Sequence, residues 1–360
     1  MAVFIFFLFV TIFWGIFLTY QNNLIRNILT LILVSYLFVI TAWRNFSVGT
    51  DTINYISFFD YLGSPTIKVD FFNFFEMIQS RFEYGYILLN KVVYHFTQNP
   101  RYLLIVSSFI IYCALYIFVR QLSRDPYLSL TMFVSLGYMA SSMNTMRQSI
   151  AIAFVMLAYV SILKYRNYFF GVVYIFCGFL FHKTALIFLI IVLLKNWKYS
   201  KKNVFLLLVG SVIVSLMYGK FSGVINQINY TDYSNSGITS GYLGIVVNIS
   251  LILIFISVGN IAKKNVDLSG DKDENSTLQL LIVIAIGVYL VSFNFSQLTR
   301  IAMYFQLAML IYVPNVLSSI KDNKLKIYLY LFSYSVLVTY FFVVLVVRPH
   351  WSNITPYLFG

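Results

Sequence analysis

Long apolar runs follow one another along this 360-residue chain, and they constrain its fold more than any other feature. A helix needs roughly 20 apolar residues to cross the hydrocarbon core of a bilayer, and most of the runs approach that length. With 60% hydrophobic and 10% charged residues, a soluble domain would have a mostly apolar surface. Continuous runs favour helices over a barrel. We therefore expect an all-α, polytopic membrane protein with about twelve transmembrane helices.

The runs form one membrane domain over residues 1–360 in this interpretation. The stretch 167–197 is open to two interpretations, because His182-Lys183 marks either a tight hairpin between two short spans or an interruption in one long helix. The first run has no basic n-region and no small-residue cleavage site, so we expect a retained span. The expected spans are residues 3–20, 24–43, 102–120, 127–142, 147–165, 167–181, 183–197, 203–219, 242–262, 277–294, 299–319 and 325–347.

The net charge of +13 would suit a nucleic-acid partner, but its distribution argues against one. Short basic loops alternate with less basic connections, which is the positive-inside pattern of membrane proteins. The basic loops are then cytoplasmic, and both termini and the connections 44–101 and 220–241 face outward. The basic loops lie at Arg120/Arg124, Lys164/Arg166, Lys195 to Lys202, Lys263/Lys264 and Lys321 to Lys326.

The two outward connections differ in composition. Charged and aromatic residues mix in 44–101, which is typical of short helices lying at the membrane interface, and 84–97 also fits a re-entrant or partial span. The loop 226–242 is polar and rich in Tyr and Asn. That composition suits hydrogen bonding and stacking on sugars, but it also suits an ordinary flexible turn. Cys113 and Cys177 fall inside apolar runs and are expected to be core residues.

Two arginines open expected helices at the end opposite the basic loops. Arg147 lies in Met-Arg-Gln-Ser and Arg300 in Leu-Thr-Arg-Ile, each at the start of an apolar run. The paired donors of a guanidinium match phosphate oxygens, and a helix N-terminus adds a favourable dipole for an anion. The pattern leads to the hypothesis of an outward-facing site for a lipid-linked pyrophosphate. The alternative is that each arginine snorkels or pairs with Glu83 or Asp51.

His182 and Asp51 are candidates for acid–base chemistry on the same side. His182 follows an apolar stretch and precedes Lys183, so it is either a general base or a hydrogen-bonded core residue. Asp51 follows Gly49-Thr50 and is a base, a group that orients a sugar hydroxyl, or the N-cap of the next helix. Glu83 has the same ambiguity. No Walker, HExxH, CxxC or suitably placed DxD pattern occurs, so we expect no metal and no cofactor.

Several short motifs resemble, in order, those of the EpsG-like branch of the Wzy-type polysaccharide polymerases. The ordered set spans nearly the whole chain, and the Gly-Thr-Asp-Thr, Arg-Gln and Phe-His elements carry most of the resemblance. The matching segments are Arg44 with Val48 to Thr52 and Tyr55, Glu83 to Tyr86, Asn144 to Ala151, Leu180 to Ala185, Arg300 with Tyr304 and Phe305, and Ile354 to Tyr357.

The resemblance implies an enzyme of the bacterial cytoplasmic (inner) membrane that polymerises O-antigen or exopolysaccharide repeat units. Its architecture would be similar to that of GT-C-like membrane glycosyltransferases, which use lipid-phosphate donors. The donor would be a growing glycan on undecaprenyl pyrophosphate, and the acceptor would be the non-reducing end of a lipid-linked repeat unit. A chain-length regulator is an expected partner. Metal-independent glycosyl transfer fits the missing metal motifs best.

In this interpretation Arg147 and Arg300 neutralise the departing pyrophosphate, and Asp51 or His182 takes or orients the acceptor proton. An O-antigen ligase, a flippase for the lipid-linked unit and a membrane acyltransferase are the alternatives. A flippase is disfavoured because the mid-span segments are nearly free of charge. The residues expected to bind substrate are Arg44, Thr50, Thr52, Tyr55, Glu83, Gln148, Lys183 and Tyr304.

Overall fold

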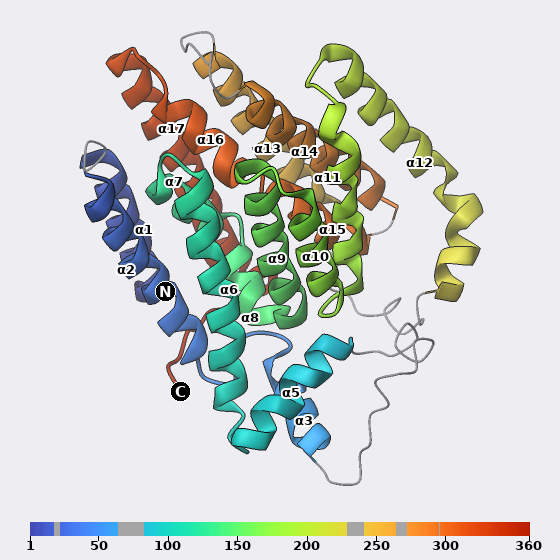
Figure 1. Ribbon diagram of the computed structural model, residues 1–360. Helices are drawn as coiled ribbons and strands as arrows, with labels where there is room; N and C mark the ends of the chain where they lie inside the picture. The colour runs from blue at the N-terminus through green and yellow to red at the C-terminus, as the bar shows by residue number, and fades with distance from the viewer. Residues whose placement is uncertain (18–21, 64–82, 229–240, 264–271, 295) are drawn as a thin grey trace. The chain divides into compact units, whose positions relative to one another are not determined.

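The computed structural model describes residues 1–17, 22–63, 83–228, 241–263, 272–294 and 296–360 (Figure 1). The structure is 83% helix, and no strand occurs in the described part beyond an isolated bridge between Arg44 and Phe359. The expected all-α class is confirmed. The chain packs as two compact units, each described by itself: Met1–Leu186 with Ile327–Gly360, and Ile187–Lys326.

Seven helices among the described residues are long and apolar enough to cross a membrane. Each expected span coincides with helical structure, so the polytopic architecture is confirmed, while the total of about twelve spans stays a prediction. The seven are Asn23–Ala42 (α2), Arg101–Leu122 (α6), Met146–Lys164 (α9, Met146–Tyr159, with η1, Val160–Lys164), Tyr242–Lys263 (α13), Glu274–Ser292 within α14 (Lys272–Ser292), Thr299–Ser318 (α15, Thr299–Gln306, and α16, Met309–Ser318) and Asn323–Val347 (α17, Asn323–Phe342, and η5, Val343–Val347).

In the first unit, α2 packs on α6, α6 on α9 and α9 on α10, and α1 packs on α7. Local capping sets where two of these helices begin. Asp125 Oδ1 accepts hydrogen bonds from the first-turn N–H groups of α7, and Asn167 Oδ1 accepts from Phe170 N of α10. The remaining helices of this unit are Ala2–Phe17 (α1), Thr52–Gly63 (α3), Tyr84–Phe96 (α5), Pro126–Ser135 (α7), Tyr138–Asn144 (α8), Tyr168–Phe179 (α10) and Pro349–Ser352 (α18).

The apolar run expected as one span over 127–142 is broken into α7 and α8. Gly137 has φ +86°, a left-handed conformation that glycine adopts without strain, and it ends the first helix. Thr145, with φ −114° and ψ 65°, separates α8 from α9. A helix break leaves carbonyl and N–H groups at the helix ends that a continuous helix would pair. The candidate site lies at the second of these breaks, between α8 and α9.

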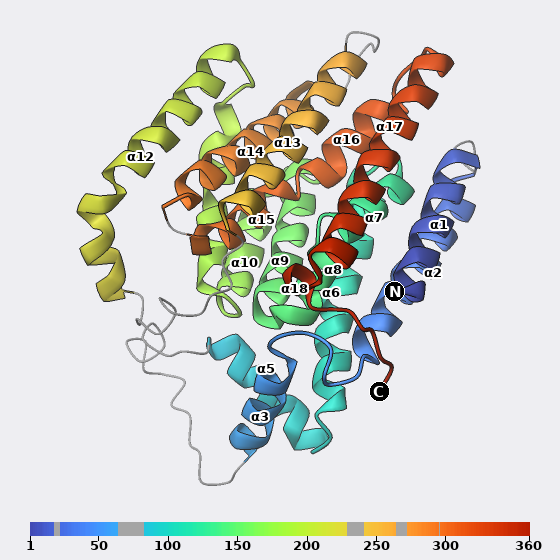
Figure 2. The same ribbon diagram turned by 180° about the vertical axis from the view of Figure 1, so that it is seen from behind.

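The described parts of the connection 44–101, which is predicted to face outward, contain two short helices. Figures 1 and 2 show α3 and α5 side by side, and Phe59 of α3 packs with Val93 of α5 and Leu103 of α6. At 1.5 Å per residue, α5 is about 20 Å long, which is too short to cross a hydrocarbon core of about 30 Å. Most of the aromatic segment 71–86 lies outside the described residues.

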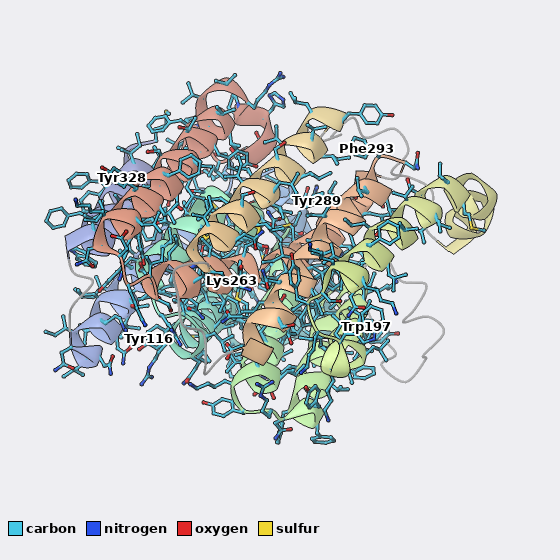
Figure 3. The ribbon with its side chains drawn as sticks, turned by 90° about the horizontal axis from the view of Figure 1, so that it is seen from above. Tyr116, Trp197, Lys263, Tyr289, Phe293 and Tyr328 are labelled. Atoms are coloured by element: carbon cyan, nitrogen blue, oxygen red, sulfur yellow. The ribbon has the colours of Figure 1, made fainter. Side chains whose placement is uncertain are left out.

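In the second unit, α12 (Lys201–Ile228) packs on α14, α14 on α15, and α13 on α16. Lys263, labelled in Figure 3, donates to Gln279 Oε1, whose amide donates to Tyr312 Oη at 2.9 Å. The other described helices here are η2 (Lys183–Leu189, which begins in the first unit), α11 (Ile190–Leu193), η3 (Leu194–Asn196) and η4 (Ser296–Leu298). The expected sugar-binding loop 226–242 falls mostly outside the described residues.

Candidate functional site

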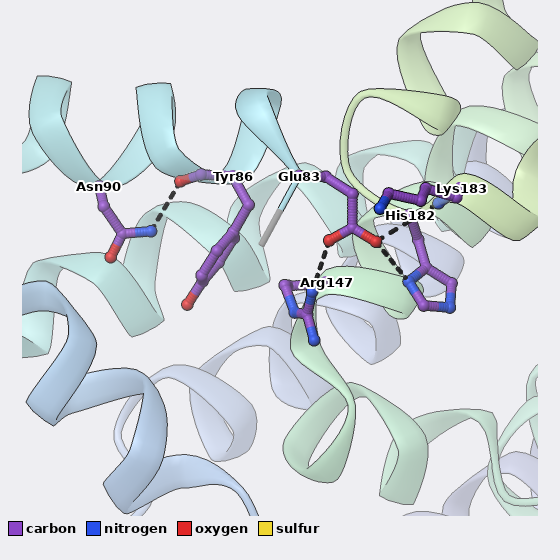
Figure 4. A network of polar contacts seen from close by, with 6 residues as sticks. All are labelled: Glu83, Tyr86, Asn90, Arg147, His182 and Lys183. Carbon is purple, nitrogen blue, oxygen red and sulfur yellow. Dashed lines mark hydrogen bonds and ion pairs between the residues drawn. The ribbon is translucent and has the colours of Figure 1, made fainter. Parts of the chain in front are cut away.

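A carboxylate, a guanidinium and an imidazole meet in the first unit (Figure 4). Arg147 Nη1 donates to Glu83 Oε2 at 2.5 Å, and His182 Nδ1 lies 3.1 Å from Glu83 Oε1. The backbone N–H of Lys183 also donates to Oε1, at 3.4 Å. Side-chain exposure is 7% for Glu83, 17% for Arg147 and 19% for His182. Glu83 therefore links two segments that the sequence separates by 64 and 99 residues from it.

Glycine allows Glu83 to reach its partners. Glu83 is the N-cap residue of α5, and Gly85 in the first turn donates its N–H to Leu180 O at 2.8 Å. A Cβ at position 85 would lie 2.7 Å from that same oxygen, which is closer than any real contact. Because the start of α5 touches the backbone of another segment here, a larger residue would push the helix away and carry Glu83 with it.

The chain reverses direction at His182. The N–H groups of Phe181 and His182 both bond Gly178 O after α10 ends at Phe179. The Cβ of Ala185 lies 3.3 Å from where a Cβ on Gly178 would be, so the chain folds back on the helix that precedes it. Of the two interpretations of 167–197, the tight hairpin is the one found. It places the imidazole at a turn, next to Glu83.

Electrostatics keep Glu83 ionised. Burial opposes ionisation of its carboxyl, but the hydrogen bond with His182 and the charge of Arg147 outweigh burial and lower the pKa of Glu83 to about 2. An ionised carboxylate only accepts hydrogen bonds, so the His182 Nδ1–H donates to it. The ion pair between Arg147 and Glu83, which the sequence offered as an alternative, is present in the structure. A guanidinium carries five N–H donors, and this contact engages one nitrogen of three.

Tyr55 of α3 brings the Gly-Thr-Asp-Thr segment to the same place. Its phenol hydrogen-bonds the Arg147 side chain, and its ring meets Tyr86 of α5 edge-on with centroids 5.6 Å apart. Burial raises the pKa of Tyr55 despite the nearby Arg147 charge, so the phenol stays protonated. Asp51 lies one turn before Tyr55, half-buried, and acts on that phenol electrostatically. Within the described residues the Asp51 carboxylate caps no helix N–H.

Arg44 and Thr52 anchor the Gly-Thr-Asp-Thr segment through hydrogen bonds to backbone carbonyl groups. Arg44 is 1% exposed and donates to Thr41 O at 2.6 Å and to Met143 O at 3.3 Å. Burial lowers the pKa of Arg44 to about 10, so it stays charged at neutral pH. The Thr52 hydroxyl bonds Val48 O at 2.7 Å. Two residues that the sequence predicts to contact substrate are therefore engaged with backbone carbonyl groups.

Comparison with known families places the sequence in one of them. The sequence model of the EpsG family matches residues 27–359. The chain belongs to the EpsG family. No curated protein and no solved structure matches it. This family points to a membrane polysaccharide-polymerase type of function, in keeping with the helices of membrane-spanning length.

The remaining expected residues of this EpsG-family protein occupy different environments. Gln148 follows Arg147 on α9 and is 2% exposed. Thr50 donates its N–H to Asn144 Oδ1 at 2.8 Å. Arg300 and Tyr304 belong to the second unit, where Arg300 lies exposed in the first turn of α15 and Tyr304 is buried. In the described part of the chain, no three His, Cys, Asp or Glu side chains are grouped so as to hold a metal ion.

Sequence reasoning gave no role to Asn144, Gly85 or the segment after α18. Asn144 and Gly85 stand within the matched motifs, but a motif does not tell which backbone group a side chain meets. Ile354 to Tyr357 also belongs to the resemblance, and the hydrogen bond from its Tyr357 hydroxyl to Ile40 O of α2 is visible only in the folded chain.

Proposed function

We propose that this EpsG-family protein is a polysaccharide polymerase of a bacterial cytoplasmic (inner) membrane. It transfers a growing O-antigen or exopolysaccharide chain from undecaprenyl pyrophosphate to the non-reducing end of a lipid-linked repeat unit, on the outer face. The observation that carries the proposal is the joint contact of Glu83 with His182 and Arg147 beside the N-terminus of α9. That arrangement supplies a candidate base, His182, and a candidate anion-binding group, Arg147, which contact the same carboxylate.

His182 is the general base of the proposed reaction. Its Nδ1–H donates to Glu83, which leaves the lone pair of Nε2 to accept the proton of the acceptor hydroxyl. Glu83 orients the ring and stabilises its protonated form, and its low pKa means that it does not take the proton itself. Asp51 is the second candidate base, because it lies beside the Tyr55 phenol that contacts Arg147.

Arg147 binds the departing pyrophosphate. As the acceptor oxygen bonds the anomeric carbon of the donor, the bond from that carbon to the pyrophosphate oxygen breaks, and the lipid pyrophosphate leaves with the electron pair. The guanidinium and the positive end of the α9 dipole stabilise the growing negative charge. We propose the same role for Arg300 of the second unit, because it also stands at the start of an apolar helix, and its variant is tested separately. Lys183 is the weaker candidate.

The proposed reaction uses no cofactor and no metal. Both substrates are lipid-linked, so the surrounding membrane lipid is part of the working environment. A chain-length regulator is proposed as a protein partner on the basis of the family.

The test compares surface polysaccharide from a strain lacking this gene and carrying plasmid copies of the parent or a variant. His182→Ala, Arg147→Ala and Arg300→Ala should each reduce long polymer to a single repeat unit, because losing a general base or an electrostatic contact costs roughly 10²- to 10⁴-fold in rate. Band profiles on gels give the readout, and immunoblots of membranes show that each variant accumulates. His95→Ala and Arg120→Ala, at exposed positions away from Glu83, are matched controls.

The outcomes separate the candidate functions. A core bearing one repeat unit means that units are made, flipped and attached but not polymerised, as proposed. Long polymer left on its lipid carrier identifies a ligase, and units trapped on the cytoplasmic side identify a flippase. Parental amounts of polymer from both Arg147→Ala and Arg300→Ala would sink the pyrophosphate assignment.

A further inference from the structure

We infer that Asn144 is a positioning residue for the proposed site, and that it acts by clamping the segment Ser352–Gly360 onto the turn Gly49–Asp51. The inference rests on the proposed function, because it concerns how the same site is held. The side-chain hydrogen bonds of Asn144 go to Thr50 and Ser352 rather than to Glu83 or His182. It stands where three separate parts of the first unit meet.

The side-chain amide of Asn144 uses both of its ends. Its Oδ1 accepts the Thr50 N–H at 2.8 Å, and its Nδ2 donates to Ser352 O at 2.5 Å. An N–H partner on one side and a carbonyl partner on the other fix which end of the amide faces which segment. Asn144 is also the last residue of α8, three residues before Arg147. One side chain therefore ties the start of α9, the Gly-Thr-Asp-Thr turn and the segment after α18.

The turn itself is shaped for this contact. Gly49 has φ +96°, and a Cβ there would lie 2.5 Å from Met143 O, so the turn lies directly on the end of α8. The Gly49 N–H bonds Asn353 O at 3.2 Å, next to the Asn144 contact with Ser352. The turn leads into α3, whose Tyr55 bonds Arg147. A shift of the turn would thus move Asp51 and Tyr55 relative to the guanidinium.

The segment Ser352–Gly360 continues along the chain that precedes the turn. It pairs through Asn45 N to Leu358 O at 2.7 Å and Gly360 N to Trp43 O at 3.0 Å, and the Tyr357 hydroxyl donates to Ile40 O at 2.6 Å. Figure 2 shows it running from α18 alongside the loop after α2. The segment has no acidic or basic side chain, so what it contributes is backbone partners and packing rather than chemistry. This composition fits a clamp.

The experiment measures polymerisation of a purified lipid-linked repeat unit by purified protein in liposomes. Asn144→Ala should lower kcat at least ten-fold with little change in KM, because the reacting groups are misplaced while substrate contacts persist. Asn144→Asp keeps the oxygen that accepts from Thr50 but loses the N–H group that donates to Ser352. Its kcat should fall as far as that of Asn144→Ala. Asn54→Ala, at an exposed site on α3, is the matched control and should keep the parental kcat.

A cross-link tests the clamp against a general folding defect. Asn45 and Leu358 are neighbours across the antiparallel Arg44–Phe359 bridge, so Asn45→Cys with Leu358→Cys can form a disulfide when Cys113 and Cys177 are replaced by Ser. In this background, oxidised Asn144→Ala should regain most of the kcat of its oxidised Asn144 counterpart and lose it on reduction. A kcat that stays low with the disulfide verified by mass spectrometry would overturn the clamp, as would a parental kcat for Asn144→Ala.

A second readout is independent of polymerase activity. Ile354 is 1% exposed, so in a chain with Cys113 and Cys177 replaced by Ser, Ile354→Cys should react slowly with maleimide beside Asn144 and several-fold faster beside Asn144→Ala. If the parent makes no polymer from any lipid-linked unit, the proposed function fails, yet a faster reaction still supports the clamp. Equal labelling rates in the two backgrounds would refute the clamp whatever the activity is.

Discussion

At the scale of single residues, the geometry of the candidate site depends on how one carboxylate is shared. Each Glu83 oxygen accepts from a different partner, so the imidazole and the guanidinium are positioned by the same group. The pairing also means that a pyrophosphate would meet Arg147 already held in place rather than a mobile side chain. Preorganised donors of this kind cost little reorganisation during a reaction, which is why they stabilise developing charge well.

Glu83→Gln and His182→Ala should show strongly non-additive effects. The amide cannot serve as an ionised acceptor for His182, so the polymerisation rate should drop roughly 10²- to 10⁴-fold. If Glu83 acts through His182, the double variant should be no slower than His182→Ala alone. Initial rates with a lipid-linked repeat unit measure the cycle. Independent, multiplying losses would show that Glu83 works mainly through another partner.

The low pKa of Glu83 predicts a specific acid sensitivity. The folded-state pKa of about 2 lies below the ordinary value of 4.5, so ionised Glu83 stabilises the folded state fully above pH 4.5. This contribution is lost as the pH falls from 4.5 through about 2. Thermal unfolding of detergent-solubilised protein should therefore decline more over this window in the parent than in Glu83→Gln. Parallel curves for the two proteins would contradict the depressed pKa.

At the scale of elements, short helices and helix breaks place the residues of the site. Arg147 stands at the start of α9 because Thr145 separates that helix from α8, and His182 stands at a hairpin because α10 ends at Phe179. Glu83 begins a helix that is too short to cross the membrane. Ends of helices thus supply all three groups, and helix ends are where unpaired backbone groups collect.

Gly85→Ala tests the contact between α5 and the hairpin. Alanine normally favours a helix over glycine by roughly 0.5–1 kcal/mol, so helix propensity alone predicts stabilisation. Here the added Cβ would collide with Leu180 O, and we expect lost polymer and a lower melting temperature instead. Gly210→Ala in α12, where a Cβ meets nothing, is the control. Parental activity of Gly85→Ala would show that α5 tolerates displacement.

At the scale of the whole molecule, the distribution of charge predicts which side of the membrane each loop faces. Ser57→Cys on α3 should react with a membrane-impermeant maleimide in intact spheroplasts, because the connection 44–101 is expected outside. Lys201→Cys, at the start of α12, should react only after permeabilisation. Both residues are exposed, and Cys113 and Cys177 are replaced by Ser in the test background. The reverse pattern of labelling would invert the predicted topology.

The all-α membrane class and the positions of most apolar helices could be read from the sequence alone. A helix satisfies its own backbone hydrogen bonds, so a continuous stretch of apolar residues is enough to predict it. Polar residues out of place in such runs, Arg147 and His182 among them, also stood out without a structure. Their residue types suggested a polar site, because a cation near hydrocarbon is costly unless it pairs with another group or faces a water-filled cavity.

What the tertiary structure alone decided is which partner each polar residue meets. Glu83 reaches Arg147 across 64 residues and His182 across 99, and no local pattern encodes such a pairing. The break at Gly137 was invisible because the apolar run continues through it. Arg44 and Thr52, which the sequence predicts to bind substrate, both bond the Met143 carbonyl group at the end of α8, and only the folded chain shows this contact. The composition of a segment determines whether it lies in the membrane or in water, whereas long-range packing determines which hydrogen bonds its side chains make.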